Sequence, residues 1–264
     1  MTLAHDPRVR EVLGGLSPFH TVEHHDLVGS TNDVALERLR AGTPPGIVVV
    51  ADRQSAGRGR RGRPWTDDVV GRTGPANLAV TATLSAPGRG VGLVPLAVGL
   101  AVLDGYATQG AVGQLKWPND VLLDDRKAAG ILVEHHTVAG GAVLLLGAGL
   151  DLDWRGVDRG GDAAGWTSVA EEVDGDVDRG EVLAGLLAGM GRWIHLAGHD
   201  PRGFVAAYRR VCRTLGQQVR VELPGGATVS GRAARIDAEG HLHVGSGGAP
   251  TVVRVGDVRH VRPA

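Results

Sequence analysis

Two apolar segments, residues 130–138 and 142–150, constrain the fold of this chain more than any other feature of its sequence. They read GILVEHHTV and AVLLLGAGL. Short runs this rich in Val, Ile and Leu are typical of strands buried in a sheet. Residues 46–52 (GIVVVAD) predict another buried strand, residues 76–85 a half-buried strand and residues 21–29 a short strand. A substantial part of the chain therefore forms a sheet.

Helical segments alternate irregularly with these strands. The first follows Ser30 or Thr31, either of which can cap it, and Asp33 supplies negative charge in its first turn. The expected helices cover residues 31–40, 93–107, 179–197 and 201–215. This mixture predicts an α+β fold.

The C-terminal segment has a different pattern. After residues 214–216 the chain shows about five short strands separated by PGG, DAEG and GSGG turns, with no helical period. We therefore predict two domains, at residues 1–214 and 215–264, the second a compact β-barrel.

Composition limits the class of protein. The 264 residues are 42% hydrophobic and 22% charged, with a formal net charge of −1, as in ordinary soluble domains. The single cysteine, Cys212, excludes an internal disulfide, and its helical spacing from Val205 and Tyr208 predicts a core position. Because no signal-peptide or membrane-spanning run is present, we expect a cytoplasmic protein without a membrane partner.

Residues 54–65 form a basic run, QSAGRGRRGRPW, which ends at Trp65. It could be a nucleic-acid arm, a solvated basic linker or a loop that binds phosphates. Alternating glycines allow the backbone to approach a ligand closely, and arginines suit bidentate phosphate contacts. The near-zero net charge argues against a dedicated nucleic-acid binder, and an indole beside the arginines could stack on a base.

Three further segments carry polar residues that could serve a site. KWPNDVLL (116–123) predicts a turn between two extended segments, with Trp117 in the core. RKAAGILVE (126–134) places Lys127 at the mouth of a strand, where a solvated lysine is equally consistent with the sequence. GSTND (29–33) is explained as a helix cap, and its N–H and hydroxyl groups could also bind a polar ligand.

Taken together, these motifs resemble those of the biotin–protein ligases. The resemblance covers about residue 20 to the C-terminus and is most specific in the basic run and in KWPND. It implies a mixed-sheet catalytic domain of the class II synthetase-like, biotin–lipoate ligase type, followed by a small Src-homology-3-like barrel. It also implies ATP, biotin and Mg²⁺ as cofactors, a biotinyl-5′-AMP intermediate and the biotin carboxyl carrier protein as acceptor.

The resemblance assigns roles residue by residue. Lys127, Arg58, Arg60 and Asp120 match catalytic positions; Arg58, Gly59 and Arg60 match the loop that closes over the biotin carboxylate and phosphates, and Trp65 matches the aromatic residue that stacks on adenine. The implied binding residues are Ser30, Thr31, Asn32, Gln54, Gly57, Arg58, Gly59, Arg60, Arg63, Trp65, Asn119, Lys127, Gly130, Gly147 and Gly149. The metal ligands are not indicated.

Two departures from the family pattern are visible. Asp151 stands where the family usually has Asn. The segment before residue 20 is too short for a helix-turn-helix domain, so we expect a monofunctional ligase that binds no DNA. A lipoate or octanoate ligase or transferase of related fold is the alternative function. Oligomeric state is left open.

Overall fold

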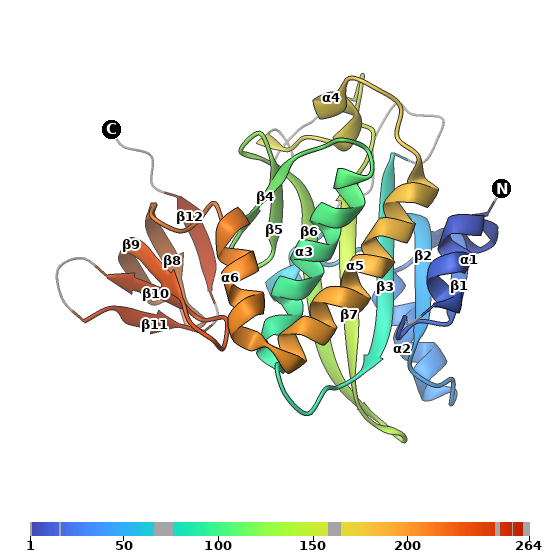
Figure 1. The fold of residues 1–264 in the computed structure, drawn as a ribbon, viewed down its shortest axis with the longest axis horizontal. Coiled ribbons are helices and arrows are strands. Elements are labelled where there is room, and N and C mark those ends of the chain that lie inside the picture. The colour runs from blue at the N-terminus through green and yellow to red at the C-terminus, as the bar shows by residue number, and fades with distance from the viewer. Residues whose placement is uncertain are drawn as a thin grey trace.

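A seven-stranded mixed sheet forms the frame of the protein (Figure 1). The computed structural model describes residues 2–15, 17–65, 76–157, 165–245, 249–254 and 256–260. The strand order is β1-β2-β3-β7-β6-β5-β4; β1 and β2 are parallel, and all other neighbours are antiparallel. The strands are β1 (Thr21–Val28), β2 (Ile47–Gln54), β3 (Asn77–Ser85), β4 (Gly113–Lys116), β5 (Asp120–Leu123), β6 (Arg126–Val138) and β7 (Gly141–Asp151). The predicted α+β class and mixed sheet are confirmed.

Helix α2 (Thr31–Arg40) connects the two parallel strands, because parallel neighbours need a crossover. Ser30 is its N-cap residue, but the Ser30 side chain makes no capping hydrogen bond. The helix packs Ala35 and Leu39 against Val49 and other strand residues in a small apolar cluster. This cluster lies on one face of the sheet.

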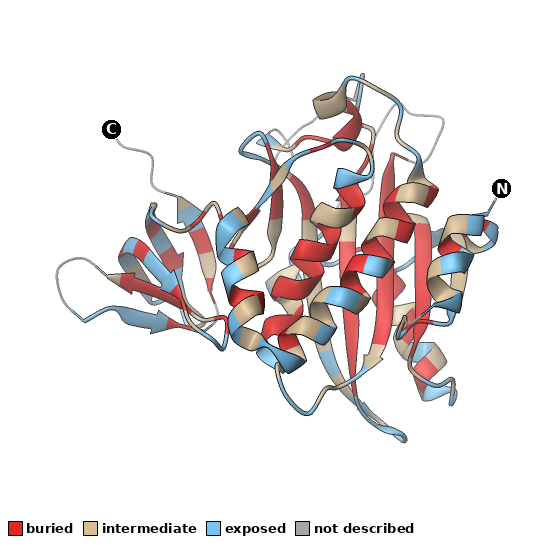
Figure 2. Cartoon of the chain, viewed as in Figure 1, coloured by how far each residue is buried: buried red, intermediate tan, exposed pale blue. Residues whose placement is uncertain are grey.

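The opposite face is covered by α3 (Val94–Ala107) and α5 (Arg179–His199), which lie in front of the sheet in Figure 1. Val48 and Val50, the neighbours of Val49, belong to the main core on this side, since successive strand residues point to opposite faces. Figure 2 shows that α3, α5 and the central strands behind them contain many buried residues. At Gly105 the two helices approach closely enough that a Cβ would lie 2.8 Å from the Val182 carbonyl oxygen.

Several element boundaries differ from the prediction. Strand β6 begins at Arg126 rather than at Gly130, because β5 pairs with this segment across a register shift between Val121 and Leu122. Lys127 therefore lies on the strand and not at its mouth. The last predicted helix ends early: α6 covers Pro201–Val211, and the next residue, Cys212, bridges to β4.

Two short helices complete the first part of the chain. Helix α1 (Pro7–Gly14) was not predicted, although Asp6 accepts a hydrogen bond from the Arg8 N–H and Pro7 follows directly, a recognisable helix start. Helix α4 covers Val169–Val173 and begins with a capping box formed by Ser168 and Glu171. Within the described residues, short 3₁₀ turns lie at Leu3–His5, Arg60–Gly62 and Val91–Leu93.

The C-terminal segment forms a separate five-stranded antiparallel sheet beside α6 (Figure 1). Its order is β11-β10-β9-β8-β12, with β8 (Gln218–Glu222), β9 (Thr228–Ile236), β10 (Leu242–Gly245), β11 (Thr251–Val253) and β12 (Asp257–His260). The five predicted strands are confirmed. The described residues show no pairing of β11 with β12, so a closed barrel is not observed.

Trp117 joins the two sheets. Its indole N–H donates to the Gly240 carbonyl at 3.0 Å, and its backbone N–H donates to the Thr214 hydroxyl at 3.0 Å. The side chain is buried, as predicted from the KWPND turn. The two sheets are therefore held together close to the residues of that turn.

Candidate active site

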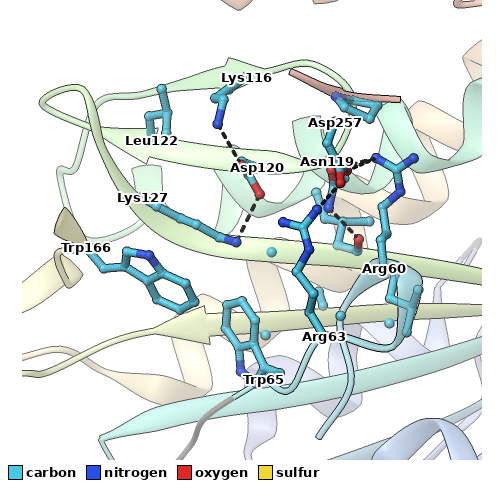
Figure 3. A pocket seen from close by; sticks show the side chains of 18 of the residues that line it. Arg60, Arg63, Trp65, Lys116, Asn119, Asp120, Leu122, Lys127, Trp166 and Asp257 are labelled. Carbon is cyan, nitrogen blue, oxygen red and sulfur yellow. Dashed lines mark hydrogen bonds and ion pairs between the residues drawn. The ribbon is translucent and has the colours of Figure 1, made fainter. Parts of the chain in front are cut away.

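A single large cavity, about 1310 Å³ in volume, collects most of the residues singled out in the sequence. Its walls come from the start of α2, the basic run, the β4–β5 hairpin, the middle of β6 and β7, and strands β8 and β12 of the second sheet. Figure 3 shows the part of this cavity around Lys127 and the arginines. All of the proposed site residues except Gly57 line it.

One end of the cavity is a buried polar network. The Gln54 amide oxygen accepts from the Thr31 backbone N–H at 2.9 Å and lies 3.2 Å from the Thr31 hydroxyl. The Thr81 hydroxyl lies 2.8 Å from the Thr31 hydroxyl and 2.5 Å from Asn32 Oδ1, and Asn32 Nδ2 donates to Glu134 at 2.6 Å. Ser30, Thr31 and Asn32 at the start of α2 thus line the same cavity as Gln54.

Thr81 and Glu134 were missed in the sequence. Thr81 sits in an alternating strand where a threonine gives no functional signal. Glu134 could have been noticed, because it is a charged residue within the apolar run GILVEHHTV. Its carboxylate orients the amide of Asn32.

The four arginines of the basic run do not meet at one place. Arg58 makes a bidentate pair with Asp33 at 2.6 and 2.7 Å, and this hydrogen bonding holds the pKa of Asp33 below its usual value. The other three turn toward the second sheet, where their common partner is Asp257 (Figure 3). The loop therefore connects the start of α2 to β12.

Arg60 is the most enclosed of these arginines. It donates to Asn119 Oδ1 at 3.1 Å and to the Gly256 carbonyl at 3.2 Å. Burial, followed by the neighbouring charge of Arg61, lowers the pKa of Arg60. An arginine held in a partly dehydrated position interacts strongly with an anion that enters the cavity.

Lys127 lies beside Asp120 in the centre of the cavity. The Lys127 ammonium is 3.0 Å from one Asp120 oxygen, and Lys116 lies 3.2 Å from the other. Burial opposes ionisation of Asp120 and is the largest single influence, but the two lysines together keep the pKa of Asp120 below its usual value. The carboxylate is therefore ionised at neutral pH and bridges two cations.

Trp65 is buried on the floor of the cavity. A Cβ placed on Gly130 would lie 2.6 Å from a Trp65 ring atom, and one on Gly149 would lie 2.5 Å away. The resemblance implies that both glycines are binding residues; in this structure their backbones lie against the indole. Gly147 instead faces Asn32, whose Oδ1 would be 2.7 Å from an added Cβ.

Two other residues singled out in the sequence, Asp151 and Cys212, are both buried. Asp151 is fully buried and outside the cavity lining, so its side chain does not form part of the cavity wall. Cys212 is buried in the core as predicted, and burial raises the pKa of its thiol.

Comparison with known proteins places this cavity in a family. The model of the biotin/lipoate A/B protein ligase family matches residues 25–151. A biotin–[acetyl-CoA-carboxylase] ligase of Mycobacterium tuberculosis is 36% identical over 272 aligned residues, which cover 96% of this chain and 93% of that protein. The chain belongs to this ligase family. A ligase of the same description from Paracoccus denitrificans is 36% identical over 173 residues, covering 62% of this chain and 69% of that protein.

The fold is shared with solved members of the family. Biotin protein ligase from Aquifex aeolicus, solved in complex with biotin and ATP, superposes with a TM-score of 0.77 at 23% identity, covering 92% of this chain and all of that one. Within the described parts of this chain, no helix has the length and apolarity needed to cross a bilayer.

Proposed function

We propose that this chain attaches biotin to a lysine of the biotin carboxyl carrier protein, with ATP as the energy source and biotinyl-5′-AMP as the intermediate. The observation that carries the proposal is one cavity that joins a buried polar network to a cluster of lysine and arginine side chains. The first suits the uncharged polar head of biotin, and the second suits a carboxylate and phosphates. The two biotin ligases described above support this assignment.

The polar end binds the biotin head group. Ser30, Thr31 and Asn32 are buried; Gln54 and Thr81 hydrogen-bond to Thr31, and Thr81 and Glu134 hydrogen-bond to Asn32, which fixes the orientation of these two residues. Hydroxyl and amide groups can donate and accept, which matches a neutral ring system that carries both N–H and C=O groups. Gly147, and Gly57 beside Gln54, leave room for these side chains.

Lys127 acts where the carboxylate and the α-phosphate meet. A biotin carboxylate oxygen attacks the α-phosphorus, the bond from phosphorus to the bridging oxygen breaks, and pyrophosphate leaves. Two anions must approach each other, so the ammonium of Lys127 and the guanidinium groups of Arg58 and Arg60 stabilise the charge that develops. Arg63 binds the departing pyrophosphate.

The second step transfers the acyl group. The neutral amine of the acceptor lysine attacks the biotinyl carbonyl, an amide forms, AMP leaves with the bonding electrons of the anhydride, and the proton lost by the nitrogen passes to water. Asp120, which is ionised and reaches the cavity, orients this amine and accepts a hydrogen bond from it. Asn119 holds Arg60 and borders the nucleotide.

Trp65 and the glycines shape the nucleotide end. Adenine stacks on the Trp65 indole, which requires the indole to leave part of its present contact with Gly130 and Gly149. Gly59 allows the loop to bend over the intermediate, and its backbone N–H already donates to the Arg63 carbonyl across the loop.

A protein cage for Mg²⁺ is not formed by the described cavity residues. Asp120 pairs with two lysines, Asp125 with Arg213, and Asp257 with loop arginines. We propose that Mg²⁺ enters bound to the ATP phosphates, as is usual for this ion, and there neutralises phosphate charge.

The two sheets have distinct tasks in this proposal. Residues 1–214 form the catalytic domain, and residues 215–264 form the smaller domain. We propose that the smaller domain is a Src-homology-3-like barrel. Its Asp257 reaches the basic loop, so this domain assists closure of the nucleotide site. The domain division rests on the separate sheets and their separate strand pairings.

The test is adenylate formation by the purified protein. Incubation with ATP and biotin should yield biotinyl-AMP, and addition of a biotin carboxyl carrier domain should yield the biotinylated carrier, both measured by mass spectrometry. Lipoate offered instead should give no adenylate; turnover with lipoate alone would overturn the proposal.

Lys127→Ala gives the residue-level test. It should abolish biotinyl-AMP synthesis in a single turnover while leaving the far-UV circular dichroism spectrum unchanged. Lys116→Ala is the matched control, because it removes the other cation from the same Asp120 carboxylate. Near-normal synthesis by the Lys127 variant would refute the role assigned to this lysine.

A further inference from the structure

Trp166 forms a rigid wall beside Lys127. Its backbone pairs with that of Lys127 in a short parallel bridge, and the Thr167 N–H donates to the Lys127 carbonyl at 2.7 Å. The segment that carries Trp166 is thus attached to β6 at the residue whose side chain it contacts. The backbone of the basic loop takes no part in this attachment.

Trp154 stacks against the Trp166 ring. The two indoles are nearly parallel, with ring centroids 6.1 Å apart and planes inclined by 16°. Trp154 is buried, and its indole N–H donates to Asn77 at 2.5 Å. Its backbone N–H donates to the Ser168 hydroxyl at 2.9 Å. The Trp166 ring therefore packs against an indole that is itself held by two hydrogen bonds.

The Lys127 ammonium lies over this ring. It is 4.5 Å from the Trp166 ring centroid and 5.2 Å from that of Trp65, while Asp120 lies 3.0 Å away (Figure 3). An ammonium within 6 Å of an indole face is attracted by the ring quadrupole, more strongly where water is excluded. The lysine is thus held by one carboxylate and two aromatic faces.

We propose that Trp166 is a positioning residue for Lys127: its indole face holds the ammonium at the reacting phosphate while leaving the charge and the N–H donors available. This inference rests on the proposed function. A second carboxylate at this place would neutralise the charge and repel the phosphate. An aromatic face has neither effect, and it restricts a side chain with four rotatable bonds.

The alternative role for Trp166 is that of a nucleobase wall, an indole that stacks against the adenine of ATP. The Trp65 and Trp166 ring centroids are 5.1 Å apart, and two stacked layers around a base need about 7 Å. A base enters between them only after Trp65 moves. The contact with Lys127, in contrast, already exists and is fixed by the backbone bridge.

The kinetic test compares Trp166→Leu and Trp166→Phe in biotin-dependent ATP–pyrophosphate exchange. The leucine variant should lower kcat by about tenfold while KM for ATP and biotin changes by less than about twofold, because only the hold on the ammonium is lost. The phenylalanine variant should recover most of the rate, since it restores an aromatic face. Trp193→Leu is the control: Trp193 also carries a cation, Arg192, over its ring at 4.7 Å, but lies outside the cavity lining.

A second measurement is independent of activity. The sequence contains two lysines, Lys116 and Lys127, and both pair with Asp120. Trace labelling with acetic anhydride, read by mass spectrometry, should show Lys127 modified several-fold faster relative to Lys116 in the Trp166→Leu protein. The ratio should be unchanged in Trp193→Leu.

The results of these two experiments distinguish failure of the inference about Trp166 from failure of the proposed function. An unchanged kcat together with an unchanged labelling ratio in Trp166→Leu overturns the inference. A higher KM for ATP at constant kcat identifies Trp166 as a nucleobase wall and also overturns it. If the unmodified protein forms no biotinyl-AMP, the proposed function fails; the labelling ratio then still decides whether Trp166 holds Lys127.

Discussion

Replacement of Gly149 by alanine tests the position of Trp65 on the floor of the cavity. The new Cβ would lie 2.5 Å from Cε2 and 2.7 Å from Cζ2 and Nε1 of the indole, whereas carbon atoms in contact normally lie 3.5–4.0 Å apart. Retreat of the ring is opposed by the Trp166 ring, whose centroid lies 5.1 Å from that of Trp65, so the overlap is relieved only in part. Overpacking of this kind lowers the free energy of unfolding by about 1–3 kcal/mol.

The sign of the effect should reverse when Trp65 is removed. In a Trp65→Ala background the alanine at 149 meets no ring, and alanine in a strand is more stable than glycine by about 0.5–1 kcal/mol. The propensity gain is the same in both backgrounds and cancels, so the two substitutions should couple by about 1–3 kcal/mol, the strain that removal of the ring relieves.

Urea unfolding followed by far-UV circular dichroism on the four proteins of this double-mutant cycle gives the coupling directly. Gly147→Ala is the matched control, because its Cβ would meet Asn32 Oδ1 and the Leu132 carbonyl rather than Trp65. It should be additive with Trp65→Ala within about 0.5 kcal/mol. Additivity of the Gly149 and Trp65 changes within the same margin would refute the placement of the indole.

Other regions give independent tests. Asp257→Asn removes the carboxylate that holds the loop at 58–63, so trypsin should cleave this loop about two- to fivefold faster, as measured on gels over time. Tyr106→Phe removes a buried hydroxyl that donates to the Ala128 carbonyl at 2.6 Å, which should lower the free energy of unfolding by about 1–2 kcal/mol in urea titrations. Burial raises the pKa of the Cys212 thiol, so its thiolate is scarcer in the native than in the unfolded protein; iodoacetamide at pH 8 should modify it much more slowly without urea than with it, and equal rates would contradict this burial.

Local patterns in the sequence predicted most of the secondary structure. Apolar runs such as 142–150 correspond to β7, and the PGG and DAEG turns separate β8, β9 and β10 of the second sheet, while most of the GSGG segment lies outside the described residues. The predicted ends of helices and strands were wrong where tertiary contacts set them. Strand β6 extends back to Arg126 because β5 pairs with it, and α6 ends at Val211 because Cys212 bridges to β4.

The motifs also identified the family, because Gln54, the basic run and the KWPND turn combine in an order that few sequences share. They did not reveal the partners of these residues. Asp257 lies some two hundred residues from the arginines that it contacts, and nothing in the turn before β12 marks it as part of a site. Charge pairs between distant segments have no local sequence signal.

The sequence by itself therefore determined which chemical groups this ligase carries and roughly which helices and strands hold them, because these depend on residue type and local period. The tertiary structure decided which partners these groups contact. Arg58 pairs with Asp33 of α2, the other loop arginines turn to the second sheet, and Lys127 lies between Asp120 and two indoles. A backbone bridge between Trp166 and Lys127 of β6 holds Trp166 beside this lysine. Such contacts depend on sheet order and on the packing of side chains from distant segments, which one-dimensional patterns do not encode.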